Sequence, residues 1–186
     1  NRNILITGAA GFIGTALGSS LSQRGYRLHG IDTHSAREPQ NWDSFFVEDC
    51  NTFDFEKALR KGSYAALIHL AGGASVPASV DNPYEDFGST LPTTARAALA
   101  LGVFSPSTRF ILFSSAAVYG NPVSLPVQTS EDIDPISPYG VHKFCAELLL
   151  QKYCHIYQFN ATVVRPFSVY GPGLTRQVIY DICFKV

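Results

Sequence analysis

The sequence predicts an α/β fold in which helices cover both faces of a doubly wound parallel sheet. Short apolar runs rich in Ile, Leu, Val and Phe alternate along the chain with longer segments of helical spacing. Such alternation is typical of parallel strands joined by crossover helices. A glycine-rich turn directly after the first apolar run is a second indication, because this fold places such turns between its first strand and first helix.

Six apolar runs are predicted to be strands, because each is short and almost continuously apolar, as expected of strands buried on both faces. They cover residues 3–7, 27–31, 44–47, 65–70, 109–113 and 161–164. The segments predicted to be helices cover residues 12–24, 55–61, 84–101 and 138–158. Right-handed crossovers between the strands follow from the chirality of the chain.

Capping residues support several helix boundaries. Asp54 precedes the second predicted helix and can accept a hydrogen bond from its first turn. Ser137 followed by Pro138 is typical of a cap and a first helical position. Gly102 is predicted to end the third helix. The proline-rich segment 120–138 is predicted to be an ordered loop.

The composition indicates one globular domain and excludes several classes of protein. The chain has 186 residues, 46% of them hydrophobic, and a formal net charge of −1. It can therefore bury a core, but it offers no basic surface for nucleic acid or for an anionic membrane. No apolar run is long enough to span a bilayer.

The cysteines of the chain form no C-x-x-C pair, which favours buried free thiols in a reducing compartment over a metal site or disulfides. They are Cys50, Cys145, Cys154 and Cys183.

The turn after the first strand carries a variant of the dinucleotide-binding fingerprint. Gly8, Gly11 and Gly14 allow a tight turn, close approach of a pyrophosphate and close packing of the helix. The helix N-terminus then presents free N–H groups to the phosphates. Asp32 ends the second predicted strand, where a carboxylate can accept hydrogen bonds from the adenosine ribose and repel a 2′-phosphate. The sequence therefore favours NAD over NADP, with a plain turn and a solvated aspartate as the alternatives.

A tyrosine and a lysine stand four residues apart at the start of the last predicted helix. Tyr139 and Lys143 form a Y-x-x-x-K pattern, which places both side chains on one helix face. A nearby ammonium favours the phenolate form and lowers the pKa of the tyrosine. Tyr139 could then accept a proton from a substrate hydroxyl and return it later. The alternative is a surface tyrosine with an unrelated lysine.

Two serines end the fifth predicted strand, at the sheet edge where α/β proteins bind ligands. Ser115 could donate a hydrogen bond to the same substrate oxygen that Tyr139 serves. No Gly-x-Ser-x-Gly turn surrounds the pair, which disfavours a hydrolase nucleophile. Serines that merely cap the strand end are the alternative.

Taken in order, these motifs resemble those of the extended short-chain dehydrogenase/reductase superfamily, and within it the NAD-dependent epimerase/dehydratase family that acts on nucleotide sugars. The resemblance implies a Rossmann-type fold and extends from Ile4 to about Gly173. Its motifs begin with Thr7-Gly8-x-x-Gly11-x-x-Gly14, Asp32, Asp49-Cys50 and His69-Leu70-Ala71-Gly72. They continue with Ser114-Ser115-x-x-Val118-Tyr119-Gly120, Tyr139-x-x-x-Lys143 and the segment Arg165-Pro166-Phe167-Ser168-Val169-Tyr170-Gly171-Pro172-Gly173.

The resemblance implies a role for each matching residue. The catalytic residues are expected to be Ser115, Tyr139 and Lys143. The cofactor-binding residues are expected to be Gly8, Gly11, Phe12, Ile13, Gly14, Asp32, Asp49, Cys50, Leu70, Ala71, Gly72, Tyr139, Lys143 and Pro166. The substrate-binding residues are expected to be Ser75, Ser115, Ala116, Tyr139 and Ser168. No metal is implied.

The reaction that the resemblance implies is epimerisation at C4 of a UDP-hexose type of nucleotide sugar, through a transient 4-keto sugar. Related dehydratases place an acid pair directly after the catalytic Ser or Thr, whereas this chain has Ala116 and Ala117, which cannot transfer protons. A keto-sugar reductase or dehydratase of the same family, and a non-catalytic NAD-binding regulator, are the alternatives. Phe167-Ser168 replaces a common Phe-Asn, and the usual Asn near Thr90 is missing, which weakens the substrate assignment.

The resemblance also bears on domains, assembly and location. Residues 1–174 are expected to form the NAD-binding domain, and residues 175–186 to begin a substrate-binding lobe that is otherwise missing from a truncated chain. Segment 75–83 resembles a loop of UDP-hexose 4-epimerases, with an ordinary proline-containing loop as the alternative. The predicted helices 84–101 and 138–158 are expected to pair with their copies in a cytoplasmic homodimer, or else to pack within one subunit.

Overall fold

A single parallel sheet of six strands organises the molecule. The computed structural model describes residues 2–175 and 178–184. The strands are β1 (Asn3–Thr7), β2 (Arg27–Asp32), β3 (Ser44–Val47), β4 (Ala66–His69), β5 (Arg109–Phe113) and β6 (Ala161–Val164). Their order is β3-β2-β1-β4-β5-β6, with every pair parallel. The order reverses between β1 and β4, so the strand ends separate there and leave a crevice.

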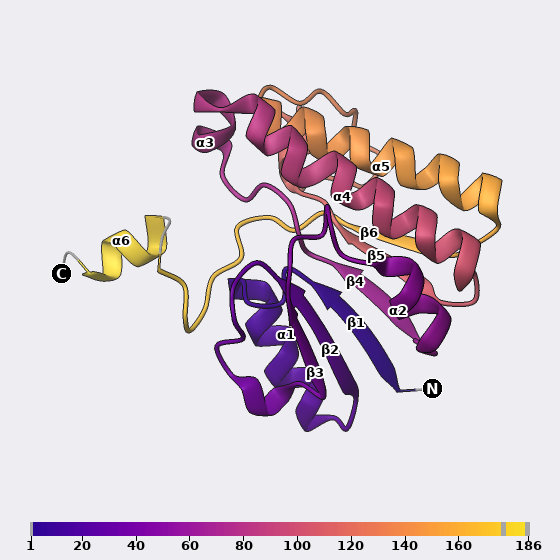
Figure 1. Ribbon diagram of the computed structural model, residues 1–186. Helices are drawn as coiled ribbons and strands as arrows, with labels where there is room; N and C mark the ends of the chain where they lie inside the picture. The colour runs from indigo at the N-terminus through magenta and orange to yellow at the C-terminus, as the bar shows by residue number, and fades with distance from the viewer. Residues whose placement is uncertain (1, 176–177, 185–186) are drawn as a thin grey trace.

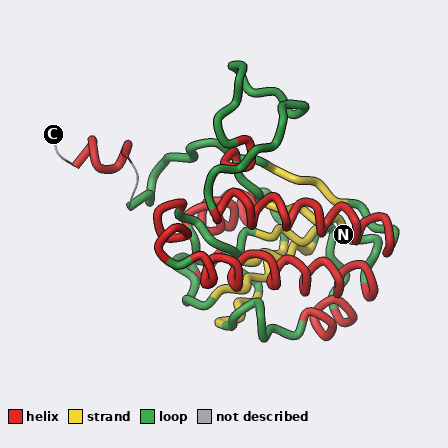
Figure 2. Tube along the Cα trace, turned by 90° about the horizontal axis from the view of Figure 1, so that it is seen from above, coloured by secondary structure: helices red, strands yellow, loops and turns green. Residues whose placement is uncertain are grey.

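Helices cover the sheet on both faces, as predicted (Figure 1). One core packs apolar side chains of the strands, such as Leu67 and Phe110, against helices α2, α4 and α5. The other core packs Ile6 and Leu28 against α1. Figure 2 shows the two longest helices, α4 and α5, running side by side across the strands. The helices are α1 (Phe12–Gln23), α2 (Phe55–Lys61), α3 (Val76–Asp81), α4 (Pro83–Phe104), α5 (Pro138–Tyr157) and α6 (Val178–Phe184), with 3₁₀ turns η1 (Pro39–Asn41) and η2 (Ala116–Tyr119).

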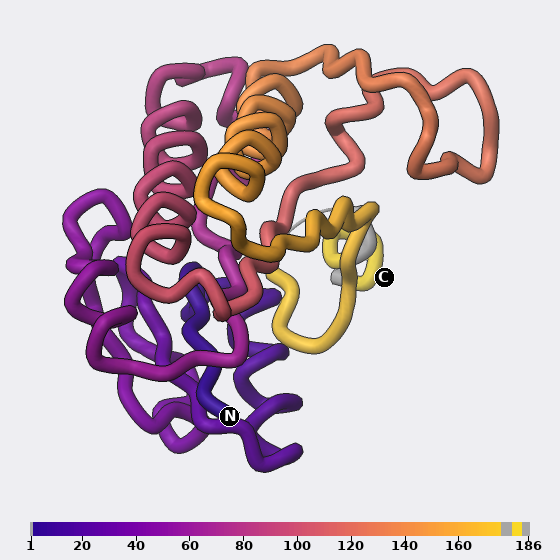
Figure 3. The backbone as a smooth tube through the Cα atoms, turned by 90° about the vertical axis from the view of Figure 1, so that its right-hand side faces the viewer, coloured from indigo at the N-terminus to yellow at the C-terminus, as the bar shows by residue number. Residues whose placement is uncertain are grey.

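Sequence patterns located most of these elements within one or two residues. The predicted bounds of β1, β3, β5, β6 and α2 are confirmed. Asp54 caps α2 by accepting a hydrogen bond from the Lys57 N–H, and Ser137 caps α5 through the Gly140 N–H. Figure 3 shows segment 120–137 extending from the body of the molecule as a loop, as its prolines predicted.

Three predictions about local structure were wrong. Gly102 does not end its helix, because α4 continues to Phe104. It lies inside the helix where a β-carbon would come within 2.7 Å of Tyr157, so its role is to let α4 approach the end of α5. Segment 75–83 is not a loop, because Ser75 caps the short helix α3 and Pro77 lies in its first turn. The cysteines are not all buried: Cys50 is, whereas Cys145 and Cys154 are half-buried and Cys183 is exposed.

A buried ion pair joins the edge strand to the helical layer. Arg165, directly after β6, donates from Nε to Glu147 Oε1 at 3.0 Å, and from Nη1 to the Tyr119 hydroxyl at 2.8 Å. The Glu147 carboxylate, which belongs to α5, is 7% exposed. The pair therefore fixes the end of β6 against α5 and η2.

Among the described residues, no helix is both long and apolar enough to cross a membrane.

Candidate functional site

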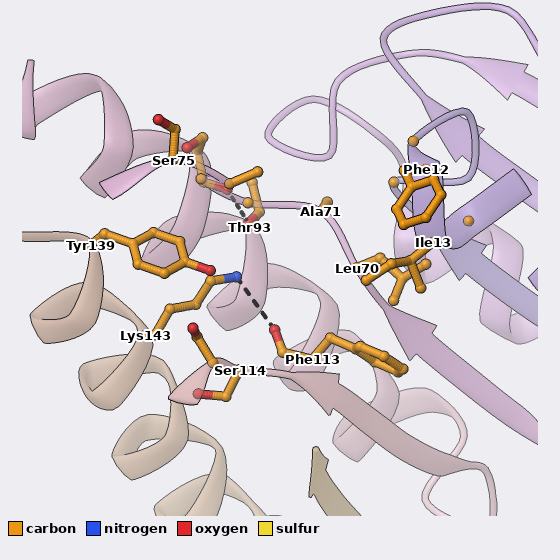
Figure 4. A pocket seen from close by; sticks show the side chains of 18 of the residues that line it. Phe12, Ile13, Leu70, Ala71, Ser75, Thr93, Phe113, Ser114, Tyr139 and Lys143 are labelled. Atoms are coloured by element: carbon orange, nitrogen blue, oxygen red, sulfur yellow. Dashed lines mark hydrogen bonds between the residues drawn. The ribbon is translucent and has the colours of Figure 1, made fainter. Parts of the chain in front are cut away.

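The crevice at the strand ends widens into one large cleft of about 1330 Å³. Its walls come from the turn after β1, the end of β2, the segments after β3 and β4, the end of β5, the start of α5 and the segment after β6. The structure places every predicted site residue on these walls. They are Gly8, Gly11, Phe12, Ile13, Gly14, Asp32, Asp49, Cys50, Leu70, Ala71, Gly72, Ser75, Ser115, Ala116, Tyr139, Lys143, Pro166 and Ser168. Figure 4 shows how side chains from several of these elements face one another across the cleft.

The glycine-rich turn forms the floor of the cleft between β1 and α1. Gly8 has a φ of +67°, and a β-carbon there would lie 2.8 Å from the Ala71 nitrogen. A β-carbon at Gly14 would lie 2.3 Å from the Gly8 carbonyl oxygen, so only glycine lets α1 start this close to the strand. Gly11 is exposed and directly precedes the first turn of α1. The turn therefore presents bare backbone and a helix N-terminus to the cleft.

A carboxylate at the end of β2 is held beside this turn. Asp32 Oδ2 accepts a hydrogen bond from the Ala10 N–H at 2.9 Å, and Oδ1 accepts one from the His34 N–H at 3.0 Å. Its side chain is 13% exposed. Because two backbone groups fix the carboxylate, it enters the cleft in a defined position that suits a ligand with vicinal hydroxyls.

The segment after β3 supplies a neighbouring wall. Asp49 Oδ1 accepts a hydrogen bond from the Asn51 N–H at 2.7 Å, which holds the turn that follows. Burial, with a smaller effect from the Asp49 and Asp32 charges, raises the pKa of the Cys50 thiol to about 12. Cys50 is therefore a neutral thiol near neutral pH and is suited to packing rather than to nucleophilic chemistry.

The first turn of α5 brings Tyr139 and Lys143 into the cleft together (Figure 4). The Lys143 Nζ atom is 5.6 Å from the centroid of the Tyr139 ring and donates a hydrogen bond to the Phe113 carbonyl oxygen at 3.3 Å. Lys143 is 4% exposed, and burial lowers the pKa of its amine to about 8, although the Asp86 charge partly opposes the shift. The tyrosine N–H is tied to α3, because it donates to the Ser79 hydroxyl at 3.1 Å.

The end of β5 lies across from the tyrosine and lysine. The Ser115 hydroxyl accepts a hydrogen bond from the Ala117 N–H at 3.1 Å, so it caps η2 while it lines the cleft. Its own O–H remains a donor that can serve a ligand. Ala116 and Ala117 bring no titratable group to this edge. Capping and ligand binding, which the sequence posed as alternatives, are thus compatible in Ser115.

The remaining predicted residues occupy the outer walls. Ser75 caps α3 by accepting from the Ala78 N–H at 3.3 Å. The Pro166 carbonyl oxygen accepts from the Ala116 N–H at 3.0 Å, which joins the segment after β6 to η2. Ser168 lines the cleft two residues further on and is exposed.

Sequence reasoning missed a group of buried polar residues behind the cleft. Asp86 and His142 form a hydrogen bond between α4 and α5. Thr90 accepts a hydrogen bond from the Gly73 N–H at 2.9 Å, at the position where the sequence lacks the expected Asn. His69 is fully buried, and burial lowers its pKa to about 3. One sequence signal could have indicated this group: polar residues recur on an otherwise apolar face of α4. They are Asp86, Thr90, Thr93 and Thr94.

Comparisons with known proteins match most of the chain. A family model described as the NAD dependent epimerase/dehydratase family matches residues 4–182. A UDP-glucose 4-epimerase of Mycolicibacterium smegmatis is 32% identical over 180 residues, which cover 90% of this chain and 56% of that protein. A UDP-glucuronate 4-epimerase of Thermodesulfobacterium geofontis is 31% identical over 184 residues, which cover 91% of this chain and 56% of the relative.

A solved structure gives the same result. The crystal structure of UDP-glucose 4-epimerase from Brucella ovis in complex with NAD superimposes with a TM-score of 0.83 at 30% identity, and the match covers 90% of this chain and 52% of that one. The chain thus spans about half the length of the proteins that it matches.

Proposed function

The chain belongs to the NAD-dependent epimerase/dehydratase family, and on this premise we propose that it forms the cofactor-binding and catalytic part of a nucleotide-sugar 4-epimerase, an isomerase of carbohydrate metabolism. One observation carries the proposal: Ser115, Tyr139 and Lys143 lie on the same cleft as the glycine-rich turn. The relatives in the comparisons act on UDP-glucose or UDP-glucuronate according to their names.

The cleft fits NAD. The space at Gly8 and Gly14 is closed to any β-carbon, and the exposed backbone at Gly11 is open to a pyrophosphate. Asp32 would hold the adenosine ribose, and Lys143 the nicotinamide ribose. The remaining contacts are assigned to Phe12, Ile13, Asp49, Cys50, Leu70, Ala71, Gly72, Tyr139 and Pro166. When bound, NAD supplies a reversible hydride acceptor for C4 of the sugar.

The protein side chains handle the proton and the geometry. Tyr139 accepts the proton of the sugar 4-hydroxyl and later returns it, and the Lys143 ammonium favours the phenolate that this requires. The Ser115 O–H donates to the same oxygen, which stabilises the charge that develops there. The 4-keto sugar then turns within the cleft, with Ser75, Ala116 and Ser168 on the walls that it contacts.

An epimerase is preferred to a dehydratase because of Ala116 and Ala117. Elimination of water needs an acid and a base beside the sugar, and neither alanine can exchange a proton. A keto-sugar reductase uses the same three catalytic residues with exchangeable cofactor, so cofactor retention separates the two activities. A non-catalytic NAD-binding regulator would not need Ser115, Tyr139 and Lys143 together on one cleft.

The proposal is tested with the protein expressed from its complete coding sequence. We expect NAD to co-purify, and a screen of UDP-hexoses to show conversion at C4 without net consumption of NADH. Consumption of added NADH with a 4-keto sugar would instead identify a reductase. NAD binding without turnover of any nucleotide sugar would identify the regulator and overturn the proposal.

The proposal extends to organisation and location. Residues 1–174 form the NAD-binding domain, and residues 175–186 begin the substrate-binding region. A homodimer through α4 and α5 is supported by apolar side chains that these helices leave exposed, such as Leu99, Val103 and Leu148. Light scattering tests it. A cytoplasmic location is supported by the unpaired cysteines, and fractionation tests it.

A further inference from the structure

A buried hydrogen-bonded pair of acid and histidine lies directly behind the catalytic helix turn. Asp86 of α4 and His142 of α5 approach to 2.6 Å between Oδ2 and Nδ1, with side chains only 6% and 15% exposed. A carboxylate only accepts hydrogen bonds, so Nδ1 is the donor. The Phe87 ring packs edge-on against the imidazole at 5.6 Å, which fixes the plane of the ring. His142 stands between Tyr139 and Lys143 in the sequence, but the Y-x-x-x-K pattern does not require it.

The carboxylate of this pair packs against the loop that follows β4. A β-carbon added at Gly73 would lie 1.8 Å from Asp86 Oδ1, so the carboxylate rests directly on the backbone there. A β-carbon added at Gly72 would lie 3.2 Å from Lys143 Nζ. The buried acid and the buried amine therefore pack against two adjacent glycines, where a side chain would collide with the carboxylate and crowd the amine.

Within residues 2–175 and 178–184, few other charged groups are found near the Lys143 amine. From α4 the Asp86 charge favours the ammonium form, against the larger opposing effect of burial. His69 of β4 is neutral at working pH, because burial and the lysine charge lower its pKa to about 3. Along α5, Glu147 is committed to Arg165, and Tyr139 is a phenol whose ring centroid lies 5.6 Å from the amine. From β5 the amine meets only the Phe113 carbonyl oxygen among the hydrogen-bond partners described. Asp86 is thus the main counter-charge of the amine.

We propose that Asp86 and His142 are positioning residues: Asp86 keeps the buried Lys143 amine charged, and the His142 N–H holds that carboxylate against the Gly72–Gly73 backbone. The proposal rests on the proposed function for its benefit to catalysis, since a charged Lys143 is what favours the Tyr139 phenolate. The electrostatic link itself is a property of the folded chain and can be measured whether or not a nucleotide sugar is turned over.

The test measures the titration of Lys143 directly. Lysines carrying ¹³C at Cε are followed by NMR from pH 6 to 11 in the purified protein, and a Lys143→Arg variant identifies the signal. We expect a wild-type midpoint near 8. In Asp86→Asn the midpoint falls by about one unit, because a neighbouring charge has an effect of that order. A folded Asp86→Asn protein with an unchanged midpoint overturns the proposal.

A matched pair at His142 decides the question independently. Asn can place an N–H close to the position of the histidine Nδ1, whereas Leu fills space without a donor. We expect His142→Leu to lower the Lys143 midpoint and His142→Asn to keep it close to the wild-type value. Equal midpoints in the two variants would contradict the role of the hydrogen bond. Glu147→Gln is the control for a buried carboxylate on the same helix, and its Lys143 midpoint should stay close to that of the wild type.

Turnover adds a second readout. In Asp86→Asn, kcat/KM should fall up to about tenfold relative to wild type above pH 8 for each unit by which the midpoint moves, and should approach wild type near pH 6.5. A purely structural role would instead lower turnover equally at all pH values. If the wild-type protein shows no turnover, the proposed function fails, while the NMR titration still supports or overturns the electrostatic link.

Discussion

Two buried charged groups stand one helical turn apart on α5 and are treated in opposite ways. Glu147 and Arg165 satisfy each other within the chain, with three hydrogen bonds between them and a fourth from Arg165 to Tyr119. Hydrogen bonds to Glu147 are the largest cause that raises the pKa of Arg165. Lys143 makes one hydrogen bond to a carbonyl among the described residues, and burial lowers the pKa of its amine to about 8. The first arrangement compensates both charges within the fold, whereas the second leaves donors for a ligand.

The difference shows how one helix can serve structure and chemistry at once. A charge whose hydrogen-bond partners are all inside the protein has its burial compensated, but it has no free donor or acceptor for a substrate. A charge that is buried without full compensation costs stability and gains reactivity. The position along α5 decides which applies, because Lys143 lies at the cleft and Glu147 lies one turn away from it, beside β6.

The largest expected effect comes from a substitution at the cleft, beside Lys143. Tyr139→Phe removes the proposed proton acceptor and should lower turnover by a factor of about 10² to 10⁴. Stability should change by less than about 1 kcal/mol, as expected for a substitution that opens no cavity. Steady-state kinetics and urea unfolding on the same preparation measure both. Undiminished turnover would show that the phenol has no acid–base role.

Breaking the Glu147–Arg165 ion pair should affect stability rather than turnover. Glu147→Leu leaves the Arg165 guanidinium without its carboxylate, and we expect the free energy of unfolding to fall by about 3 kcal/mol. Urea unfolding measures the change. The double variant Glu147→Leu, Arg165→Met should recover much of the loss, because no unpaired charge remains. A single variant as stable as wild type would mean that water already satisfies the pair.

The lysine itself predicts a pH dependence of opposite sign to that of an ordinary ion pair. Its folded pKa of about 8 lies below the ordinary lysine value of 10.5. Between these values the unfolded state binds more protons, so the Lys143 contribution makes the protein more stable as the pH rises from 8 to 10.5. At pH 7 we expect Lys143→Met to be the more stable protein by up to about 3 kcal/mol. Urea unfolding at pH 7 and at pH 10.5 should show that the stability difference between Lys143→Met and the wild type becomes smaller at the higher pH. A constant difference would contradict the lowered pKa.

The smallest effect is expected where burial plays no part. Glu56 and Arg60 pair on the surface of α2 at 2.9 Å, with both side chains more than half exposed. Glu56→Gln should change the free energy of unfolding by less than about 0.5 kcal/mol. Thermal unfolding at low and high salt measures it. A larger effect would show that the distance between opposite charges, rather than their burial, determines how much such charges contribute to stability.

The sequence predicted what depends on neighbours along the chain. Strand and helix periods, the glycine turn at Gly8 to Gly14 and the i,i+4 pair of Tyr139 and Lys143 are all local patterns, and each lies where local reasoning placed it. Gly102 was misinterpreted because a helix-ending glycine and a close-packing glycine look alike until the partner, Tyr157, is known.

The rest depended on contacts between distant segments. Asp86 and His142 are 56 residues apart, and no local signal joins them. The burial that lowers the Lys143 pKa and the Asp86 charge that opposes it depend on segments distant in the sequence. The sequence could therefore indicate a lysine that tunes Tyr139, but not the groups that tune the lysine.

The contact between Ser79 and the start of α5 has a consequence for how this site can change. Ser79 is buried, donates to the Val76 carbonyl oxygen and accepts from the peptide N–H of Tyr139. One small hydroxyl thus links α3, which lines the cleft, to the backbone of Tyr139, the proposed proton acceptor. Under the proposed function, mutations that reshape α3 for a bulkier sugar would also shift that phenol, so substrate range and proton transfer would have to evolve together.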